Sequence, residues 1–297
     1  MGSVLSYAAD RNEGSNPANF NPCTVTSTTD WVDTAPLESL KTTPLIDSAV
    51  SVGLGTEESP INITFAWDSP IVLTYFGLHD TNLVQRATVR LKGWIDAAMT
   101  DQVAEQQVNI IPPLIRPGSL PFGAPNQFRG DLDPRDFGLL PANAHIVVPL
   151  CRVRRAQISI WGPTFQADGT ADTAVRIGLA WAGHGLRFNR RVGSGERYRS
   201  GDQRIEGDGG SVWVEPGIGR RMALIDQSVI DQDHRDELFR MAMRVGRSKP
   251  IVWLPNVESP AECAMYGGLF RRVDDHEHKY IAPDLTSGSL EYEEWRE

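Results

Sequence analysis

The stretch from Ile61 to Leu78 constrains the fold of this chain more than any other. Residues 61–68, INITFAWD, alternate strictly between apolar and polar side chains, which is the pattern of a strand with one buried face. The turn sequence Asp68-Ser69-Pro70 follows, and then the β-branched and aromatic run IVLTYFGL. A run of this kind predicts a strand covered on both faces. Two such strands in succession favour a β-rich protein.

Strand patterns recur along the chain, and helix patterns are scarce. Further strands are expected in ATVRLKGW (87–94), AHIVVPL (144–150), RRAQISIWG (154–162), IVWLP (251–255) and GSLEYEEW (288–295). The one clear amphipathic stripe comprises Leu238, Met241, Ala242 and Val245, at i, i+3, i+4 and i+7. We therefore predict an all-β chain of two β-sandwich-like domains, with one flanking α-helix at about 233–245.

The domain limits follow from these patterns and from one long loop. Residues 1–19 are expected to form an N-terminal arm, residues 20–160 a first sandwich, and residues 161–297 a second domain. The segment 110–141 is dense in proline and glycine yet apolar. Such a loop within a compact domain is usually functional or packs on a partner.

Charge is unevenly distributed over the 297 residues, whose net charge is -9. Residues 1–149 carry 8 basic and 16 acidic side chains, residues 150–221 carry 12 and 7, and residues 222–297 carry 9 and 15. A basic middle between acidic ends suits contacts between copies in an assembly. The candidate interface residues are Arg187, Arg190, Arg191, Arg197, Arg199 and Arg204. Interleaved acids and few aromatics argue against nucleic acid.

No motif in the sequence predicts catalysis, a cofactor or a metal. Gly193-Ser194-Gly195 lacks the strand–turn–helix frame of a serine nucleophile. The pair His276-x-His278 could bind a metal from one strand face, but a polar turn is the stronger interpretation. The three cysteines have no zinc or disulfide spacing. We expect a non-enzymatic protein, made in the cytoplasm, without a membrane anchor because no apolar run approaches the length of a bilayer span.

The residues His79-Asp80-Thr81-Asn82 admit two interpretations. Side by side they could be catalytic or face a ligand, or they could be the polar turn between two core strands. The turn is the favoured interpretation. As a ligand-facing loop, His79, Asp80 and Asn82 would act with the loop aromatics Phe122 and Phe128.

Residues 20–160 resemble the galactose-binding-like, discoidin-type β-sandwich. The resemblance lies in INITFAWDSPIVLTYFGL, the short polar turn ending in Asn82, and the following strand ATVRLKGWID. It implies a module that binds sugars through loop aromatics and polar side chains, or one that is purely structural.

Nearly the whole chain is similar to tail-tip proteins of long-tailed bacteriophages. RIGLAWAG, the Gly/Arg-rich loop, WVEPGIGRRMALIDQSVI, the helix ending RVGRSKPIVWLP, and the closing LEYEEW carry this resemblance. It implies that the second domain is a tail-tube-like or distal-tail-like ring domain, either following the sandwich or completed by Val4–Ala8 with the sandwich inserted. The expected function is that of a structural virion protein, with carbohydrate binding at the host surface as the alternative.

The expected partners follow from the tail-tip resemblance. They are other copies of the chain in a trimeric or hexameric ring, and the tube, hub, tape-measure and fibre proteins of the tail. Host glycans are the further expected ligand, and the expected location is the virion, at the tail tip.

Overall fold

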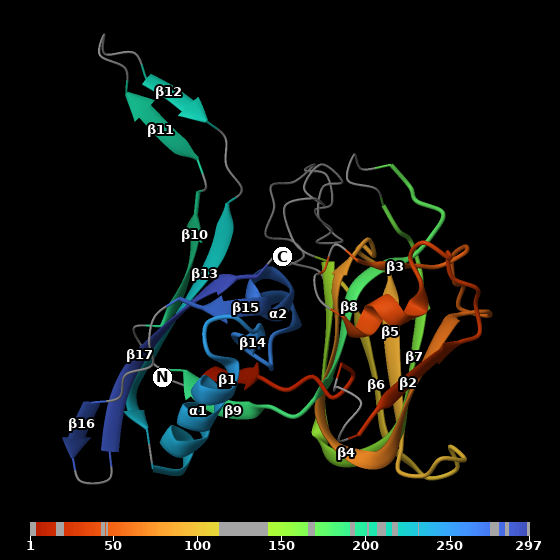
Figure 1. Cartoon of the computed structure of the whole chain (residues 1–297), viewed down its shortest axis with the longest axis horizontal. Coiled ribbons are helices and arrows are strands. Elements are labelled where there is room, and N and C mark those ends of the chain that lie inside the picture. The colour runs from red at the N-terminus through yellow and green to blue at the C-terminus, as the bar shows by residue number, and fades with distance from the viewer. Residues whose placement is uncertain are drawn as a thin grey trace, which may run out of the picture. The chain divides into compact units, whose positions relative to one another are not determined.

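The computed structural model describes the chain except for residues 1–3, 16–20, 43–44, 46, 113–141, 166–169, 191–193, 201, 207–211, 216–218, 231, 274–278, 283–284 and 296–297. Antiparallel strands dominate the described residues (Figure 1). The predicted all-β class is therefore confirmed. The predicted helix is confirmed as α1, Gln232–Val245.

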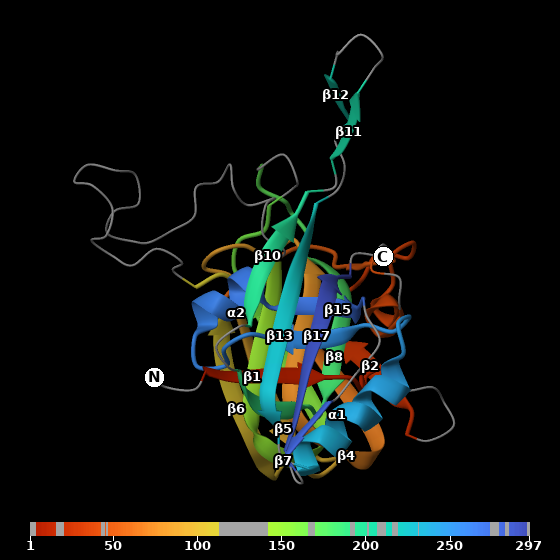
Figure 2. The same ribbon diagram turned by 90° about the vertical axis from the view of Figure 1, so that its left-hand side faces the viewer.

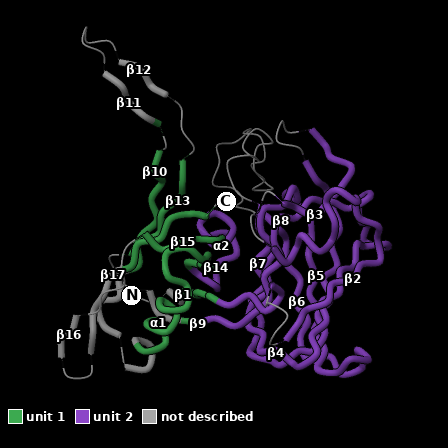
Figure 3. Tube along the Cα trace, in the orientation of Figure 1, with its two compact units in different colours: residues 1–10, 186–255, 269–296 green, residues 11–185, 256–268, 297 purple. Residues whose placement is uncertain are grey.

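The chain divides into two compact units (Figure 3). The sheet unit comprises residues 1–10, 186–255 and 269–296, and the sandwich unit comprises residues 11–185, 256–268 and 297. The first strand, β1 (Val4–Ala9), pairs with β14 (Ile251–Leu254) and with β9 (Leu186–Arg190). The N-terminal strand thus belongs to the sheet unit, and the sandwich segment is inserted after it.

The sandwich unit is built around two long, bent strands, β4 (Ile61–Thr81) and β7 (Ala142–Trp161). Their pairing shifts register between Ala66 and Ile71, where Asp68, Ser69 and Pro70 are exposed. Residues before this bend lie in one layer and residues after it lie in the other. The predicted turn at Asp68-Ser69-Pro70 is thus a bend within a single strand, so one continuous sheet supplies both layers.

The other strands of this sheet attach to opposite halves of β4 and β7. The first layer adds β2 (Cys23–Ser27) beside β4, and β5 (Thr88–Trp94) and β6 (Gln102–Asn109) beside β7. The second layer adds β8 (Arg176–Gly183) and β3 (Ala49–Val50). Because β8 pairs with β4, residues 161–185 belong to the sandwich and not to the predicted second domain.

The core between the layers is formed by the inward faces of these strands. Ile61, Ile63, Phe65 and Trp67 of the alternating stretch are all buried. Across the bend, Leu73, Phe76 and Leu78 continue this core, and Val89, Leu91, Ile158, Ile160, Ile177 and Ala180 face them from the other strands. Alternation along each strand leaves the intervening side chains on the outer faces of the sandwich.

The sheet unit contains an eight-stranded sheet (Figure 2). Its order is β10 (Gly195–Arg199), β13 (Arg220–Ile230), β17 (Leu285–Glu294), β15 (Gly268–Arg272), β14, β1 and β9, and β16 (Lys279–Ala282) pairs with β17. In addition, β11 (Gln203–Glu206) and β12 (Val212–Glu215) form a separate two-stranded ribbon.

Helix α1 contributes Leu238, Met241 and Val245 to the core of the sheet unit, as the apolar stripe predicts. Gly246 follows with a φ of 60°, the left-handed conformation that commonly ends a helix. Two short helices were not predicted: the 3-10 helix η1 (Leu37–Lys41) and α2 (Pro260–Tyr266). The sequence did hold a signal for α2, since Ser259 caps the helix and Pro260 begins it.

Candidate functional site

The predicted interface arginines that the structure describes lie on three different strands. Arg187 and Arg190 lie on β9, while Arg197 and Arg199 lie on β10, and these strands are opposite ends of the sheet order. Arg204 is on the separate ribbon strand β11. Arg191 lies outside the described residues. A shared interface of these arginines therefore stays a prediction.

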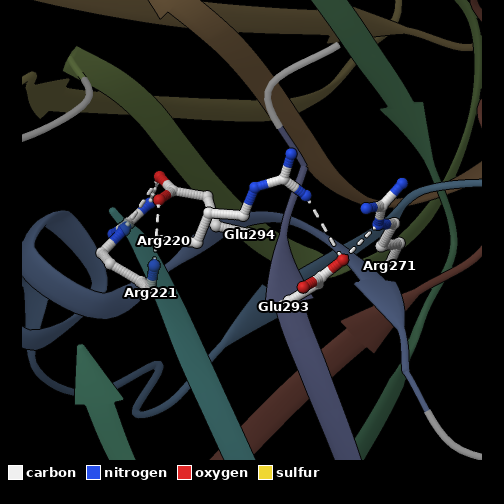
Figure 4. Close-up of polar contacts among 5 residues, drawn as sticks. All are labelled: Arg220, Arg221, Arg271, Glu293 and Glu294. Carbon is white, nitrogen blue, oxygen red and sulfur yellow. Dashed lines mark hydrogen bonds and ion pairs between the residues drawn. The ribbon is translucent and has the colours of Figure 1, made fainter. Parts of the chain in front are cut away.

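Acidic residues of β17 pair with arginines from neighbouring strands (Figure 4). The buried Glu294 accepts hydrogen bonds from Nε of Arg221 at 2.9 Å and Nη2 at 2.7 Å. Glu293 pairs with Arg220 at 3.3 Å and with Arg271 at 2.5 Å. The guanidinium of Arg221 also lies 5.7 Å from the ring centroid of Phe270. These contacts hold adjacent strands together.

The residues His79, Asp80 and Thr81 belong to strand β4, so the predicted turn at 79–82 is wrong. Strand β4 continues through Thr81, which pairs with Ala142 of β7 and Ile177 of β8. At the register shift just before it, the Asp80 N–H donates to the side-chain Oδ1 of Asn143. The chain turns after β4, where the Ala87 N–H donates to the carbonyl of Val84.

Asn82 and His79 are both buried. The amide of Asn82 donates to Asp172 and to the Ala174 carbonyl and accepts from the Arg176 N–H. This polar side chain therefore ties β4 to the segment leading into β8. Phe122 and Phe128, the aromatics predicted to act with it, lie outside the described residues.

The side chain of His79 lies in a buried polar cluster with Tyr75 and His145. The hydroxyl of Tyr75 is 3.3 Å from Nε2 of His79 and 2.8 Å from Nδ1 of His145. Burial lowers the pKa of His79 well below 6.5, and the nearby His145 lowers it further. Within this cluster His79 is fully buried, whereas His145 is partly exposed.

An open arrangement of polar side chains occurs on the outer face of the first sandwich layer. Strand registers place Asn62 of β4 beside Ser159 of β7, and Ser159 beside Arg90 of β5. In the next row, Thr64 lies beside Gln157, and Gln157 beside Lys92. We call this set the polar sheet face; it comprises Asn62, Thr64, Arg90, Lys92, Glu105, Gln107, Arg155, Gln157, Ser159 and Trp161.

Few hydrogen bonds link the side chains of the polar sheet face. Ser159 donates to Oδ1 of Asn62 at 2.6 Å, and Lys92 pairs with Glu105 at 3.6 Å. The pKa of Glu105 lies below 4.5, chiefly because Gln102 donates a hydrogen bond to it, with the charges of Lys92 and Arg90 lowering it further. Ser159 is buried, Glu105 and Gln107 are exposed, and the other side chains of this face are half-buried, so part of their hydrogen-bonding capacity is open to solvent or a ligand.

Two cations on this face have no carboxylate partner among the described residues. The guanidinium of Arg90 lies 5.5 Å from the ring centroid of Trp161, and its Nε is buried without a hydrogen bond. Nε of Arg155 is likewise buried without a partner. Arg155 lies opposite Ala66 of β4 and Trp94 of β5. It is therefore a diagonal neighbour of Lys92 on the same face.

The polar sheet face was only partly foreseeable from the sequence. Alternation indicates that Asn62 and Thr64 share one strand face and that Arg90 and Lys92 share another. Only the pairing of β4, β7 and β5 brings these side chains together, and that pairing joins distant segments. Among the described residues, no group of three or more His, Cys, Asp or Glu side chains could hold a metal ion. Nor does any described helix have the length and apolar character needed to cross a membrane.

No protein-family model matches the sequence, and no curated protein matches it. Several solved structures of carbohydrate-binding modules are similar to the chain. One is the family 32 module of C. perfringens NanJ in complex with galactose, with 7% identity and a TM-score of 0.33, covering 60% of this chain and 98% of that one. Another is GH31 CBM32-2 bound to GalNAc, with 12% identity and a TM-score of 0.33, covering 55% and 98%.

A third similar structure is the CBM32 of AlyQ in complex with 4,5-unsaturated mannuronic acid. It shows 13% identity and a TM-score of 0.31, covering 54% of this chain and 94% of that one. At these identities and TM-scores, no ligand and no residue role transfers to this chain.

Proposed function

We propose that the sandwich unit is a carbohydrate-binding module and that the polar sheet face is its binding surface. The observation that carries this proposal is the continuous array of hydroxyl, amide and guanidinium groups across β4, β7 and β5. Saccharides present dense hydroxyl groups that donate and accept hydrogen bonds at once. A surface with both donors and acceptors, such as Asn62, Gln157 and Arg90, can match them.

The composition of this face also suits a wet, polar interface better than an apolar one. The outer face of an antiparallel sheet is polar by default when it meets water. Here three central strands offer amide and guanidinium groups whose flat shape suits neighbouring hydroxyls, and water can bridge the remaining gaps. Trp161, which is partly exposed beside Arg90, adds an aromatic surface at the end of the array.

Affinity electrophoresis of the whole chain through gels containing neutral or acidic polysaccharides tests this function. We expect at least one polysaccharide to retard the protein. Gln157→Ala should abolish most of the retardation, and Arg176→Ala is the matched surface control, because Arg176 is exposed on β8 in the other layer. Unchanged mobility in every gel, together with no binding on a glycan array, would refute the proposal.

A second candidate is the structural role in a phage tail tip, with the protein in the virion and bound to other tail proteins. The observation that favours it is that β9 and β10 each pair on one side only among the described strands. Such edge strands can pair with a neighbouring copy in a ring. Native mass spectrometry of the intact chain should then give a closed oligomer, trimeric or hexameric. A monomer at every concentration, alone and with tail proteins, would contradict this role.

A further inference from the structure

We propose that the ligand of the polar sheet face is an acidic saccharide, whose carboxylate or sulfate groups are bound by Arg90, Lys92 and Arg155. This inference rests on the proposed carbohydrate-binding function and narrows its ligand class. It is drawn from the charges on this face.

The charge of the polar sheet face is opposite to that of the unit that carries it. The sandwich unit contains 20 acidic and 12 basic residues, a net charge of -8. On the polar sheet face, however, three cations are accompanied by one acid, Glu105, which pairs with Lys92. A local cation excess on an acidic unit provides charge complementarity for an anion.

The guanidinium groups of Arg90 and Arg155 are not neutralised by a carboxylate among the described residues. Neither has an ion pair or a hydrogen bond among the described residues, whereas Arg221 and Arg271 of the sheet unit are both paired with glutamates. The Nε atom of each is buried, but neither side chain is fully buried, so the terminal guanidinium nitrogens can donate to a bound carboxylate or sulfate. Arginine is well suited to this because its planar fork can bind an oxyanion through two parallel hydrogen bonds.

The spacing of the cations suits a chain with repeated acidic groups. Arg90 and Lys92 are two residues apart on one strand, which separates them by roughly 7 Å along β5. Arg155 lies on the adjacent strand opposite Trp94, so it is a diagonal neighbour of Lys92 at roughly 7–8 Å and lies further from Arg90. A single carboxylate cannot contact all three cations at once. A polymer that carries several acidic groups should therefore bind more tightly than a single acidic sugar.

Trp161 fixes one of these cations in place. Its ring lies under the guanidinium of Arg90, and this stacking restricts the side chain before any ligand arrives. Arg90→Lys keeps the charge but loses both the planar fork and most of the stacking. It therefore separates the recognition of an oxyanion by Arg90 from simple attraction between opposite charges.

The test compares polygalacturonate with the same polymer after its carboxyl groups have been reduced, using isothermal titration calorimetry with the whole chain. We expect the reduced, neutral polymer to bind at least tenfold more weakly. Arg90→Gln and Arg155→Gln should each weaken binding to polygalacturonate by about tenfold, the scale of one hydrogen bond to a charged group. Arg176→Gln, with the same charge change on β8, should leave binding unchanged. Thermal unfolding of each variant shows whether the fold is intact.

Two further probes identify the anion and its carrier. Dextran sulfate replaces the carboxylates with sulfates, and duplex DNA supplies a polyanion without an acidic saccharide. Binding of one or both acidic polysaccharides but not of DNA supports the proposal and shows which anion is preferred. Equal binding of DNA would overturn it, because the face would then attract any polyanion.

The outcomes also distinguish this inference from the function on which it rests. If the neutral polymer binds as tightly as polygalacturonate, and Gln157→Ala weakens both while Arg90→Gln weakens neither, the module binds saccharides but does not select acidic ones. If no saccharide binds in any form, the carbohydrate-binding function and the acidic ligand are both refuted.

Discussion

The hydroxyl of Tyr75 lies 2.8 Å from Nδ1 of His145, a residue 70 positions further along the chain. Both side chains belong to the paired strands β4 and β7, and Tyr75 also reaches Nε2 of His79. Such a polar network stabilises the fold only while each histidine ring is in the protonation state that allows these hydrogen bonds to form.

The sandwich unit is expected to lose stability as the pH falls below about 6.5. His79 is buried and its folded-state pKa is lowered well below 6.5, so an unfolded chain binds a proton in this range and the folded one does not. Stability is then fully present above pH 6.5 and falls below it, by at most about 1.4 kcal/mol per pH unit for one proton. Urea denaturation between pH 7.5 and 5 measures this slope. A His79→Gln variant should show a smaller slope, and an equal slope would contradict the assignment to His79.

Gly77→Ala is expected to destabilise the sandwich unit. A Cβ at this position would lie 2.1 Å from the hydroxyl of Tyr75 and 2.8 Å from Nε2 of His79. The added methyl group must displace the Tyr75 ring, at a cost of about 1–3 kcal/mol. Gly195→Ala is the control, since a Cβ there meets nothing within 4 Å. Chemical denaturation that shows equal stability for both variants would contradict the packing of Tyr75 over Gly77.

Arg221→Met is expected to destabilise the sheet unit by about 3–5 kcal/mol, because it removes the guanidinium that pairs with the buried carboxylate of Glu294. The double variant Arg221→Met/Glu294→Met should recover much of this loss, since no uncompensated charge remains. The exposed pair of Arg197 with Glu291 is the control, and Arg197→Ala should cost about 0–1 kcal/mol. Thermal unfolding followed by calorimetry measures the loss of stability in each variant. Similar losses for Arg221→Met and Arg197→Ala would contradict the expected difference between a buried and an exposed ion pair.

Ser259→Ala is expected to weaken α2 by about 1 kcal/mol. The Ser259 hydroxyl accepts a hydrogen bond from the Glu262 N–H at the start of the helix. Ser259→Asp keeps an acceptor at the same place and should retain most of the stability. Hydrogen exchange of the α2 amides measures the change, and equal protection in the alanine and wild-type chains would contradict the capping role.

Local patterns predicted the strands well because alternation depends only on neighbouring residues. Ile61 to Trp67 alternate in burial as the sequence indicates, and the bend occurs at Asp68-Ser69-Pro70. The turn after β4 was misplaced because His79-Asp80-Thr81-Asn82 is rich in turn-forming residues. The actual turn, near Arg86 with a φ of 75°, contains neither glycine nor proline.

The helix signals and the candidate site illustrate two further limits of sequence reasoning. The S-x-x-E signature of α2 is present, but Glu262 accepts from Asn256 in place of completing the reciprocal capping bond. The polar sheet face depends on Arg90 and Ser159 being cross-strand neighbours. No local pattern specifies that pairing.

The pairing of β1 with β14 has a consequence for synthesis of the chain. Tyr7 must find Leu254, so the sheet unit cannot close until nearly the whole polypeptide has left the ribosome. Residues 11–185, which make up most of the sandwich unit, emerge from the ribosome much earlier and can fold before β1 has a partner strand. Apart from α2, which residues 256–268 add later, the inserted segment contains its own core, so evolution can replace it with another domain and keep the strand order of the sheet unit.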